Sequence, residues 1–417
     1  MRRIALAAVL AAGIAVTASG CASTGDGGDE NVLTVVSWKS EDTNDADMKT
    51  INDLFRKEHP EIKLEYTWVD NPDWLTYNNP RFAAGTAADV LMLDRVKMIA
   101  FASQGFLADL SDQPWVDRQM DDLTPFNQYD GKTYQFNAEN IPLGLYANMD
   151  LLAQAGIDEV PQTWPEFIDA LETLKAAGIP GFSVPNKGGW MGEQIALELA
   201  ATHVPAGWVE DYDAGDASFT GTWDPVVDAF KELFAKDLVD PALSLGLDPN
   251  VDAMPEFQAG KWAFMVQGAW SLTNILENAQ FEVTLNAFPG GPAGSEPKAF
   301  NFVGSGWGIN AAAKNPDAAR TYLDFLASPE IATIFLEAEA GFSTLKDVPS
   351  PSNEASKPIE DSFAAGNVTP SVAQMLNDPD AEFDLIKGVE NIFLNPTAPA
   401  SDTTSLLNSL VEPTQLK

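Results

Sequence analysis

Short apolar runs alternate with amphipathic segments along most of this chain, and that alternation limits the possible folds more than any single motif does. The run at 32–36 is nearly continuous and rich in β-branched residues, 62–68 alternates apolar with polar residues, and a third run covers 90–93. A continuous apolar run is typical of a strand in a parallel sheet whose two faces are both covered by helices. We therefore expect an α/β fold.

The segments between and after these runs predict helices. Apolar residues recur on one side of 48–55, a second helix is expected over 96–104, and Thr163 and Glu166 have the spacing of a capping box. Further strands are predicted at 262–266 and 303–310, and further helices at 271–277, 315–325 and 328–341. The polar, Pro- and Ser-rich stretch 349–358 is predicted to connect two parts of the molecule.

The N-terminus has the layout of a secretory signal peptide, because Arg2 and Arg3 precede an apolar run and four small residues. The apolar run is shorter than the roughly 20 residues that span a membrane. Cys21, the only cysteine, follows at once, and Ala18-Ser19-Gly20-Cys21 resembles the bacterial lipobox. We expect a signal peptide over 1–20, a lipidated tether over 21–30, and attachment to the outer side of the cell membrane. The alternative is a free cysteine behind an ordinary cleavage site.

The chain is strongly acidic, with 61 acidic and 24 basic residues and a formal charge of -37. Removing the signal peptide with its two arginines makes the charge -39, and the acidic residues are spread along the chain. This distribution argues against nucleic acid as a partner and disfavours anionic ligands. The 397 residues that remain of 417 after removing 20 exceed a single ordinary core, so we expect two lobes.

Enzyme signatures are mostly missing. The sequence contains no G-x-S-x-G, H-E-x-x-H or P-loop motif, and the two histidines, His59 and His203, lie far apart. We therefore expect no metal, no cofactor and no enzymatic activity. Acidic residues are so numerous that counting them leaves a glycosidase pair open.

Eleven tryptophans in a chain with few cations are the informative feature. Sugars have apolar faces and hydroxyl rims, so their sites combine flat aromatic rings with acids and amides. Most tryptophans pack in protein cores, so only a few of the eleven are expected to contact a ligand. In open α/β sheets, ligands bind beyond the carboxyl ends of strands, so the candidates are the residues that follow predicted strands. Predicted strand ends carry Trp38, Asp94 with Arg95, and Trp270. Trp307 lies within a predicted strand, so packing in the core is the alternative to a ligand contact there.

Several stretches carry a family resemblance through their order and spacing. They are 82–90, 105–110, 141–142 with 147–152, 161–167, 257–265 leading to Gly268-Ala269-Trp270, and 306–310 with 315–319. Together they resemble the family 1 extracellular solute-binding proteins, which include the maltose- and oligosaccharide-binding proteins of ABC importers. The resemblance covers nearly the whole mature chain.

The resemblance implies a two-lobed, periplasmic-binding-protein-like α/β fold with a ligand cleft between lobes that are joined by crossing hinge segments. Lobe 1 would take 31–140 plus 300–348, and lobe 2 would take 141–299 plus 349–417. A monomer of this kind would bind a carbohydrate, close on it and deliver it to the permease subunits of an ABC transporter.

The resemblance also assigns site residues. Trp270 matches the family's stacking tryptophan, and Asp94-Arg95 matches a pair that hydrogen-bonds sugar, with a local salt bridge capping the next helix as the alternative. Glu139 and Asn140 lie where the chain first crosses between lobes, and Trp190, Trp38 and Glu41 are further ligand candidates. The sequence Tyr146-Ala147-Asn148 departs from the family's usual Tyr-Tyr-Asn, so no ligand contact is assigned there.

Two other functions remain open at this point. A secreted carbohydrate-active enzyme would share the export signal and the tryptophans. The same fold could also hold a non-sugar solute such as a polyamine or a peptide, and a polyamine would suit the acidic charge.

Overall fold

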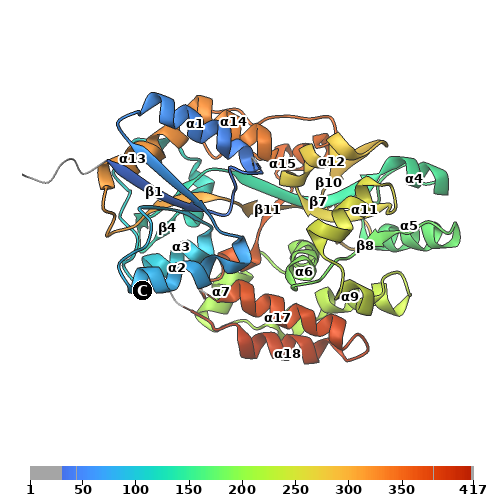
Figure 1. Ribbon diagram of the computed structural model, residues 1–417. Coiled ribbons are helices and arrows are strands. Elements are labelled where there is room, and N and C mark those ends of the chain that lie inside the picture. Colours follow the sequence, from blue (N-terminus) through green and yellow to red (C-terminus); the bar gives the residue numbers. More distant parts are fainter. Residues whose placement is uncertain (1–30, 44, 379, 415–417) are drawn as a thin grey trace, which may run out of the picture. The chain divides into compact units, whose positions relative to one another are not determined.

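The computed structural model describes residues 31–414 apart from 44 and 379, and it confirms an α/β fold (Figure 1). Two large sheets form its framework, and a ribbon of β4 (Gln128–Tyr129) and β5 (Lys132–Thr133) accompanies them. The predicted signal peptide, Cys21 and the tether lie outside the described residues. Within the described residues, no helix is both long and apolar enough to cross a membrane.

The first sheet contains three parallel strands on one side. β1 (Val32–Ser37) lies between β2 (Lys63–Trp68) and β3 (Val90–Leu93) and runs parallel to both. β12 (Gly306–Ile309) pairs antiparallel with β3 and with the short β6 (Phe136–Asn137). The three strands predicted from the N-terminal apolar runs are thus confirmed.

Helices cover both faces of this sheet. Leu33 and Val35 of β1 belong to one apolar cluster, and Val36, which points to the other face, belongs to another. The first cluster includes side chains of α1 (Met48–Glu58), α13 (Pro316–Leu326) and α14 (Pro329–Glu339), and the second those of α2 (Trp74–Ala83) and α3 (Arg95–Ala102) (Figure 1). Because both faces are buried, apolar residues fill nearly the whole length of β1 and β3.

The second sheet is built around β7 (Asn140–Asn148), all of whose residues are buried. On one side β7 pairs antiparallel with β9 (Phe264–Gly268), and the short β8 (Phe182–Ser183) lies beyond it. On the other side, β11 (Ala299–Val303) pairs with the first half of β7 and β10 (Val283–Asn286) with the second half, while β13 (Val368–Pro370) pairs with β11.

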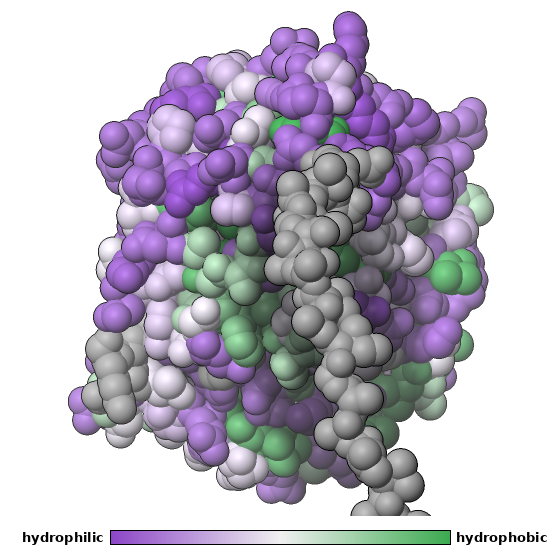
Figure 2. Space-filling view, turned by 60° about the vertical axis from the view of Figure 1, so that its left-hand side comes forward, coloured by the Kyte–Doolittle hydropathy of each residue, from purple (hydrophilic) through white to green (hydrophobic). Residues whose placement is uncertain are grey.

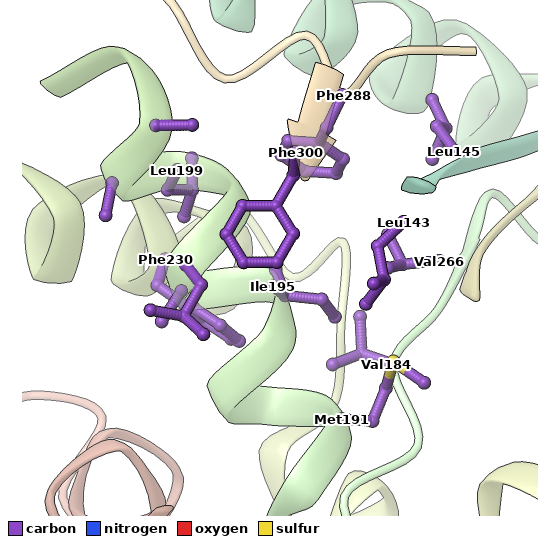
Figure 3. Close-up of a cluster of buried hydrophobic side chains, with 14 of the residues drawn as sticks. Leu143, Leu145, Val184, Met191, Ile195, Leu199, Phe230, Val266, Phe288 and Phe300 are labelled. Carbon is purple, nitrogen blue, oxygen red and sulfur yellow. The ribbon is translucent and has the colours of Figure 1, made fainter. Parts of the chain in front are cut away.

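Helices from the middle and the end of the chain enclose the second sheet. Figure 3 shows α6 (Trp190–His203) beside it, with Met191, Ile195 and Leu199 in one apolar cluster with Leu143 and Phe300. The cluster also takes side chains from α4 (Met149–Ala155), α5 (Trp164–Ala176), α7 (Trp208–Ala214), α8 (Phe219–Thr222), α9 (Asp224–Ala235), α11 (Met254–Gln258), α12 (Leu272–Asn278), α15 (Lys357–Ala364), α16 (Val372–Met375), α17 (Ala381–Leu394) and α18 (Ala400–Leu410). The short α10 (Pro241–Ser244) packs against α17.

The strands predicted at 303–310 and 262–266 have different bounds in the structure. The first prediction is wrong in joining two strands, because β11 ends at Val303 in the second sheet and β12 begins at Gly306 in the first. Between them, the Ser305 backbone N–H donates to a Glu139 carboxylate oxygen at 3.1 Å instead of to a neighbouring strand. The second predicted strand is β9, which begins two residues later than expected.

We call the first sheet with α1 to α3, α13 and α14 lobe 1, and the second sheet with its helices lobe 2. Among the described residues, the chain passes between the lobes from β6 to β7, from β11 to β12, and from α14 to α15. These crossings meet, because Asn140 pairs with Val303 and its backbone N–H donates to the Phe342 carbonyl at 3.0 Å. The fold therefore joins its two lobes through adjacent crossing segments.

Candidate functional site

The carboxyl ends of the parallel strands of lobe 1 form a row at one edge of the sheet. Trp38 and Lys39 follow β1, Trp68 is the last residue of β2, and Asp94 follows β3. Ligands of open α/β sheets collect beyond such ends. Trp68 is not among the site residues predicted from the sequence, although its place at the end of an alternating strand is a signal that would have identified it.

Contacts within lobe 1 fix the two tryptophan rings of this row. The Trp38 ring packs edge-on against Trp74 with centroids 6.4 Å apart, and the Lys97 ammonium lies 5.2 Å from its centroid. The indole N–H of Trp68 donates to the Trp38 carbonyl at 3.1 Å, while the Trp68 side chain stays 53% exposed. Trp68 therefore offers an aromatic face whose polar atom already has a partner.

Asp94 forms a local ion pair and caps α3. One carboxylate oxygen accepts the Lys97 backbone N–H at 2.8 Å, and the other pairs with the Lys97 ammonium. Burial alone would lower the pKa of Lys97, but the charges of Asp94 and then Glu382 outweigh it and raise that pKa. Glu382 lies in the first turn of α17 in lobe 2, so this cluster couples the two lobes electrostatically. Asp94 thus caps α3 and forms its salt bridge with Lys97, whereas the salt bridge considered between Asp94 and Arg95 is not among the ion pairs of the described residues.

Arg95 is engaged at the crossing between the lobes. Its guanidinium donates to the Pro125 carbonyl at 2.9 Å, to the Leu376 carbonyl at 3.1 Å and to the Gln374 carbonyl. Burial lowers the pKa of Arg95 to about 10, and the nearby Asp213 carboxylate opposes this shift. Arg95 thus ties α3 to the segment after β13, and its predicted contact with sugar stays a prediction.

Glu139 is buried close to the ion pair of Lys39 and Glu339, and Asn140 follows it in the chain and is also buried. One Glu139 carboxylate oxygen accepts the Ser305 N–H, and the other has no partner among the described residues. Burial and then the charge of Glu339 raise the pKa of Glu139 to about 8, with Lys39 opposing. The Asn140 side-chain oxygen is likewise buried without a partner in the described part of the chain.

Trp190 and Trp270, far apart in the sequence, meet in lobe 2. Trp190 begins α6 and Trp270 lies in the turn after β9, with ring centroids 6.1 Å apart and planes inclined by 38°. A Cβ atom at Gly268 would lie 2.1 Å from the Trp270 ring, so only glycine permits this ring position. The Tyr146 hydroxyl donates to the Gly268 carbonyl at 2.9 Å and fixes the end of β9. The two predicted tryptophans therefore form one half-buried aromatic pair.

Glu193 and Gln194 follow Trp190 by one helical turn and are not among the site residues predicted from the sequence. Both are almost fully buried; the Gln194 amide donates to one Glu193 oxygen at 2.6 Å, and the other has no partner among the described residues. Burial and then the charge of Glu382 raise the pKa of Glu193 well above its ordinary value. In the sequence, they stand out as adjacent polar residues in a segment whose other residues are mostly apolar.

Glu41 and Trp307 make their contacts within lobe 1. Glu41 forms a salt bridge of 2.9 Å with Arg56 and accepts a hydrogen bond of 3.1 Å from Asn52. Trp307 is fully buried in the core, with its ring centroid 6.1 Å from that of Tyr322. Packing, the alternative considered for Trp307, is what the structure shows, and a ligand contact of either residue stays a prediction.

A surface cavity of about 270 Å³ lies elsewhere on lobe 2, with Leu171, Ile179 and Trp262 in its wall. It contains none of the predicted site residues. In the described part of the chain, no group of three or more His, Cys, Asp or Glu is placed to hold a metal ion. The candidate site therefore comprises the residues at the carboxyl ends of the strands and at the crossing between the lobes. These positions carry the half-buried tryptophan rings and the buried oxygen atoms that have no partner among the described residues.

A fold of two α/β lobes joined by crossing segments is typical of proteins that bind a solute between lobes. Residues 39–333 match the family model described as bacterial extracellular solute-binding protein, so the chain belongs to that family.

Individual relatives cover nearly the whole chain. It is 24% identical over 430 residues to the maltodextrin-binding protein MdxE of Bacillus subtilis, covering 97% of this chain and 95% of that protein. It is 25% identical over 414 residues to the diacetylchitobiose binding protein DasA of Streptomyces coelicolor, covering 91% and 92% of the two chains. A solved structure described as a chitin oligosaccharide binding protein superposes with a TM-score of 0.80 at 22% identity, over 92% of this chain and 98% of the other.

Proposed function

We propose that this protein captures a carbohydrate, an oligosaccharide rather than a single sugar, between its lobes and delivers it to the permease of an ABC importer. The observation that carries the proposal is the meeting of Trp190 and Trp270 beside the buried acid and amide of Glu193 and Gln194. Flat rings suit the apolar faces of sugars, and acids and amides suit their hydroxyl groups. The names of MdxE and DasA, which refer to sugar oligomers, support the same class of ligand.

Binding would drive closure of the lobes. The turn that carries Trp270 packs against α14 of lobe 1, whose last residue, Glu339, pairs with Lys39. A ligand on Trp270 is thus positioned to contact both lobes, and only the closed form makes both sets of contacts. The closed protein would dock on the permease, and no covalent chemistry is required of this chain. The proposal divides the chain into lobe 1, residues 31–140 plus 300–348, and lobe 2, residues 141–299 plus 349–417. The separate apolar clusters of lobe 1 and lobe 2 support the outline of this division.

The proposal includes a lipid anchor at Cys21 and action as a monomer outside the cell. Support comes from the sequence alone, because Cys21 follows a short apolar run and small residues. Cys21→Ser should release the protein into the medium or block removal of the signal peptide. Membrane attachment and processing that both remain normal in this variant would contradict the anchor.

A thermal-shift screen with mono- and oligosaccharides tests the ligand class. A sugar at 100 times its dissociation constant should add about 2.7 kcal/mol to the free energy of unfolding. Stabilisation by spermidine or a peptide, with none by sugars, would instead support the alternative solutes. Turnover of an oligosaccharide by the purified protein would support a carbohydrate-active enzyme, which membership of a solute-binding family disfavours.

A further inference from the structure

Trp68 is an exposed aromatic side chain for which the fold itself gives no reason. Among the described residues, the exposed large hydrophobic side chains are Trp68, Leu243, Val251, Leu276, Phe383 and Leu394, and Trp68 is the only tryptophan. Figure 2 shows one face of the molecule, on which hydrophilic side chains predominate and hydrophobic ones gather in patches. Tryptophan is enriched at binding interfaces, where the apolar ring contacts the partner while the indole N–H is hydrogen-bonded.

The ring is held in place rather than free to fold inward. Its indole N–H donates to the Trp38 carbonyl at 3.1 Å, so the polar atom of the ring needs no ligand. Ser37 pairs with Trp68 across β1 and β2, which places Trp68 directly beside the start of the Trp38 turn. What remains exposed on Trp68 is therefore largely apolar ring surface, and that surface continues the edge that carries Trp38.

The position of Trp68 sets a minimum length for the ligand. β2 is the edge strand, and the strand order β2-β1-β3-β12 runs from Trp68 toward the crossing at Ser305 and Glu139. Neighbouring strands are about 4.8 Å apart, so three steps along this row span about 14 Å. That distance exceeds one sugar ring, so a ligand that contacts both ends of the row must contain several rings.

We infer that Trp68 is the platform of an outer subsite, on which the third or a later unit of an oligosaccharide stacks while the inner units lie near Trp190 and Trp270. This inference rests on the proposed function and adds to it the length of the ligand and a residue that selects for length. Stacking suits an outer subsite because every pyranose ring has an apolar face, whatever its linkage.

The experiment compares ligands of one to four units on matched variants. The probes are glucose and its α-1,4 and β-1,4 oligomers, N-acetylglucosamine and its β-1,4 oligomers, and the series sucrose, raffinose and stachyose. Dissociation constants are measured for the full mature chain and for Trp68→Ala, Trp68→Phe and the control Trp262→Ala. Trp262 is also a partly exposed tryptophan with its indole N–H bonded within the chain, at 2.9 Å to Glu256, but it lies at the separate surface cavity.

In the series that binds, affinity should rise from two units to three or four, and Trp68→Ala should remove most of that rise. The loss is expected to be about tenfold for the longer ligands and less than twofold for the disaccharide. Trp68→Phe should restore most of the affinity, and Trp262→Ala should leave it unchanged.

Other outcomes overturn the inference in distinguishable ways. Full affinity reached with a disaccharide, or unchanged affinity of Trp68→Ala for longer ligands, removes the outer subsite and leaves the proposed function intact. Unchanged affinity with reduced uptake by cells assigns Trp68 to contact with the permease instead. If no carbohydrate of the panel binds, the proposed function is contradicted, and the outer subsite falls with it.

Discussion

Replacing Glu139 with glutamine tests whether its carboxyl group is buried as the structure describes. In the folded chain the pKa of Glu139 is raised to about 8, mainly by burial, from the ordinary value of 4.5. Between these two values the folded chain holds more protons than the unfolded chain, so the free energy of unfolding falls as pH rises. The separation corresponds to a loss of about 4 kcal/mol between pH 5 and pH 9. Because the charges of Glu339 and Lys39 act on the Glu139 carboxyl group in opposite directions, we expect a loss of about 2–4 kcal/mol.

Glu139→Gln keeps the shape of the side chain and an oxygen for the Ser305 N–H, but it cannot ionise. The stability of the variant relative to the native chain should therefore increase by about 2–4 kcal/mol from pH 5 to pH 9. Urea unfolding at pH 5, 7 and 9 measures this difference, with Glu354→Gln at an exposed position as the control. Equal pH dependence in Glu139→Gln and the native chain would refute the burial of an uncompensated carboxyl group at the crossing.

Two further predictions concern the aromatic pair and the lobes. Gly268→Ala places a Cβ atom 2.1 Å from the Trp270 ring, so the ring must move. We expect about a tenfold loss of sugar affinity, measured by titration, with a stability cost of about 1–3 kcal/mol; unchanged affinity would show that the ring position does not matter. Closure should reduce the radius of gyration in small-angle X-ray scattering at saturating ligand, and identical curves with and without ligand would contradict it.

The sequence predicted the parts of the fold in which local pattern and burial agree. β1 and β3 are buried on both faces, so their apolar runs identified them directly. β7 was not predicted, because Pro142 and Gly144 are unusual inside a central strand, although Pro142 pairs with Asn301 there. α6 was missed because it is buried on nearly all sides, which leaves no amphipathic period to detect.

The site was predictable only where a residue's role depends on its position in an element. Trp38 and Asp94 follow strands and lie at the expected edge. The meeting of Trp190 with Trp270 depends on how α6 packs beside β9, which no local pattern encodes. The engagement of Arg95 depends on carbonyl groups nearly 280 residues later in the chain, so a family motif alone could not indicate which partners its guanidinium would take.

Trp270→Ala tests whether sugar binds on an aromatic platform between the lobes, with sugar affinity and apo melting measured in the same preparation. Trp270 is half-buried against Trp190 and Gly268, so its loss should leave melting near the native value. As the aromatic platform of the site it should contribute about 2 kcal/mol or more, so affinity should fall about thirtyfold. If Trp270 served the core instead, the variant would lose about 3–5 kcal/mol of stability. A collapsed melting temperature, or unchanged affinity for a sugar that binds the native chain, would contradict the account.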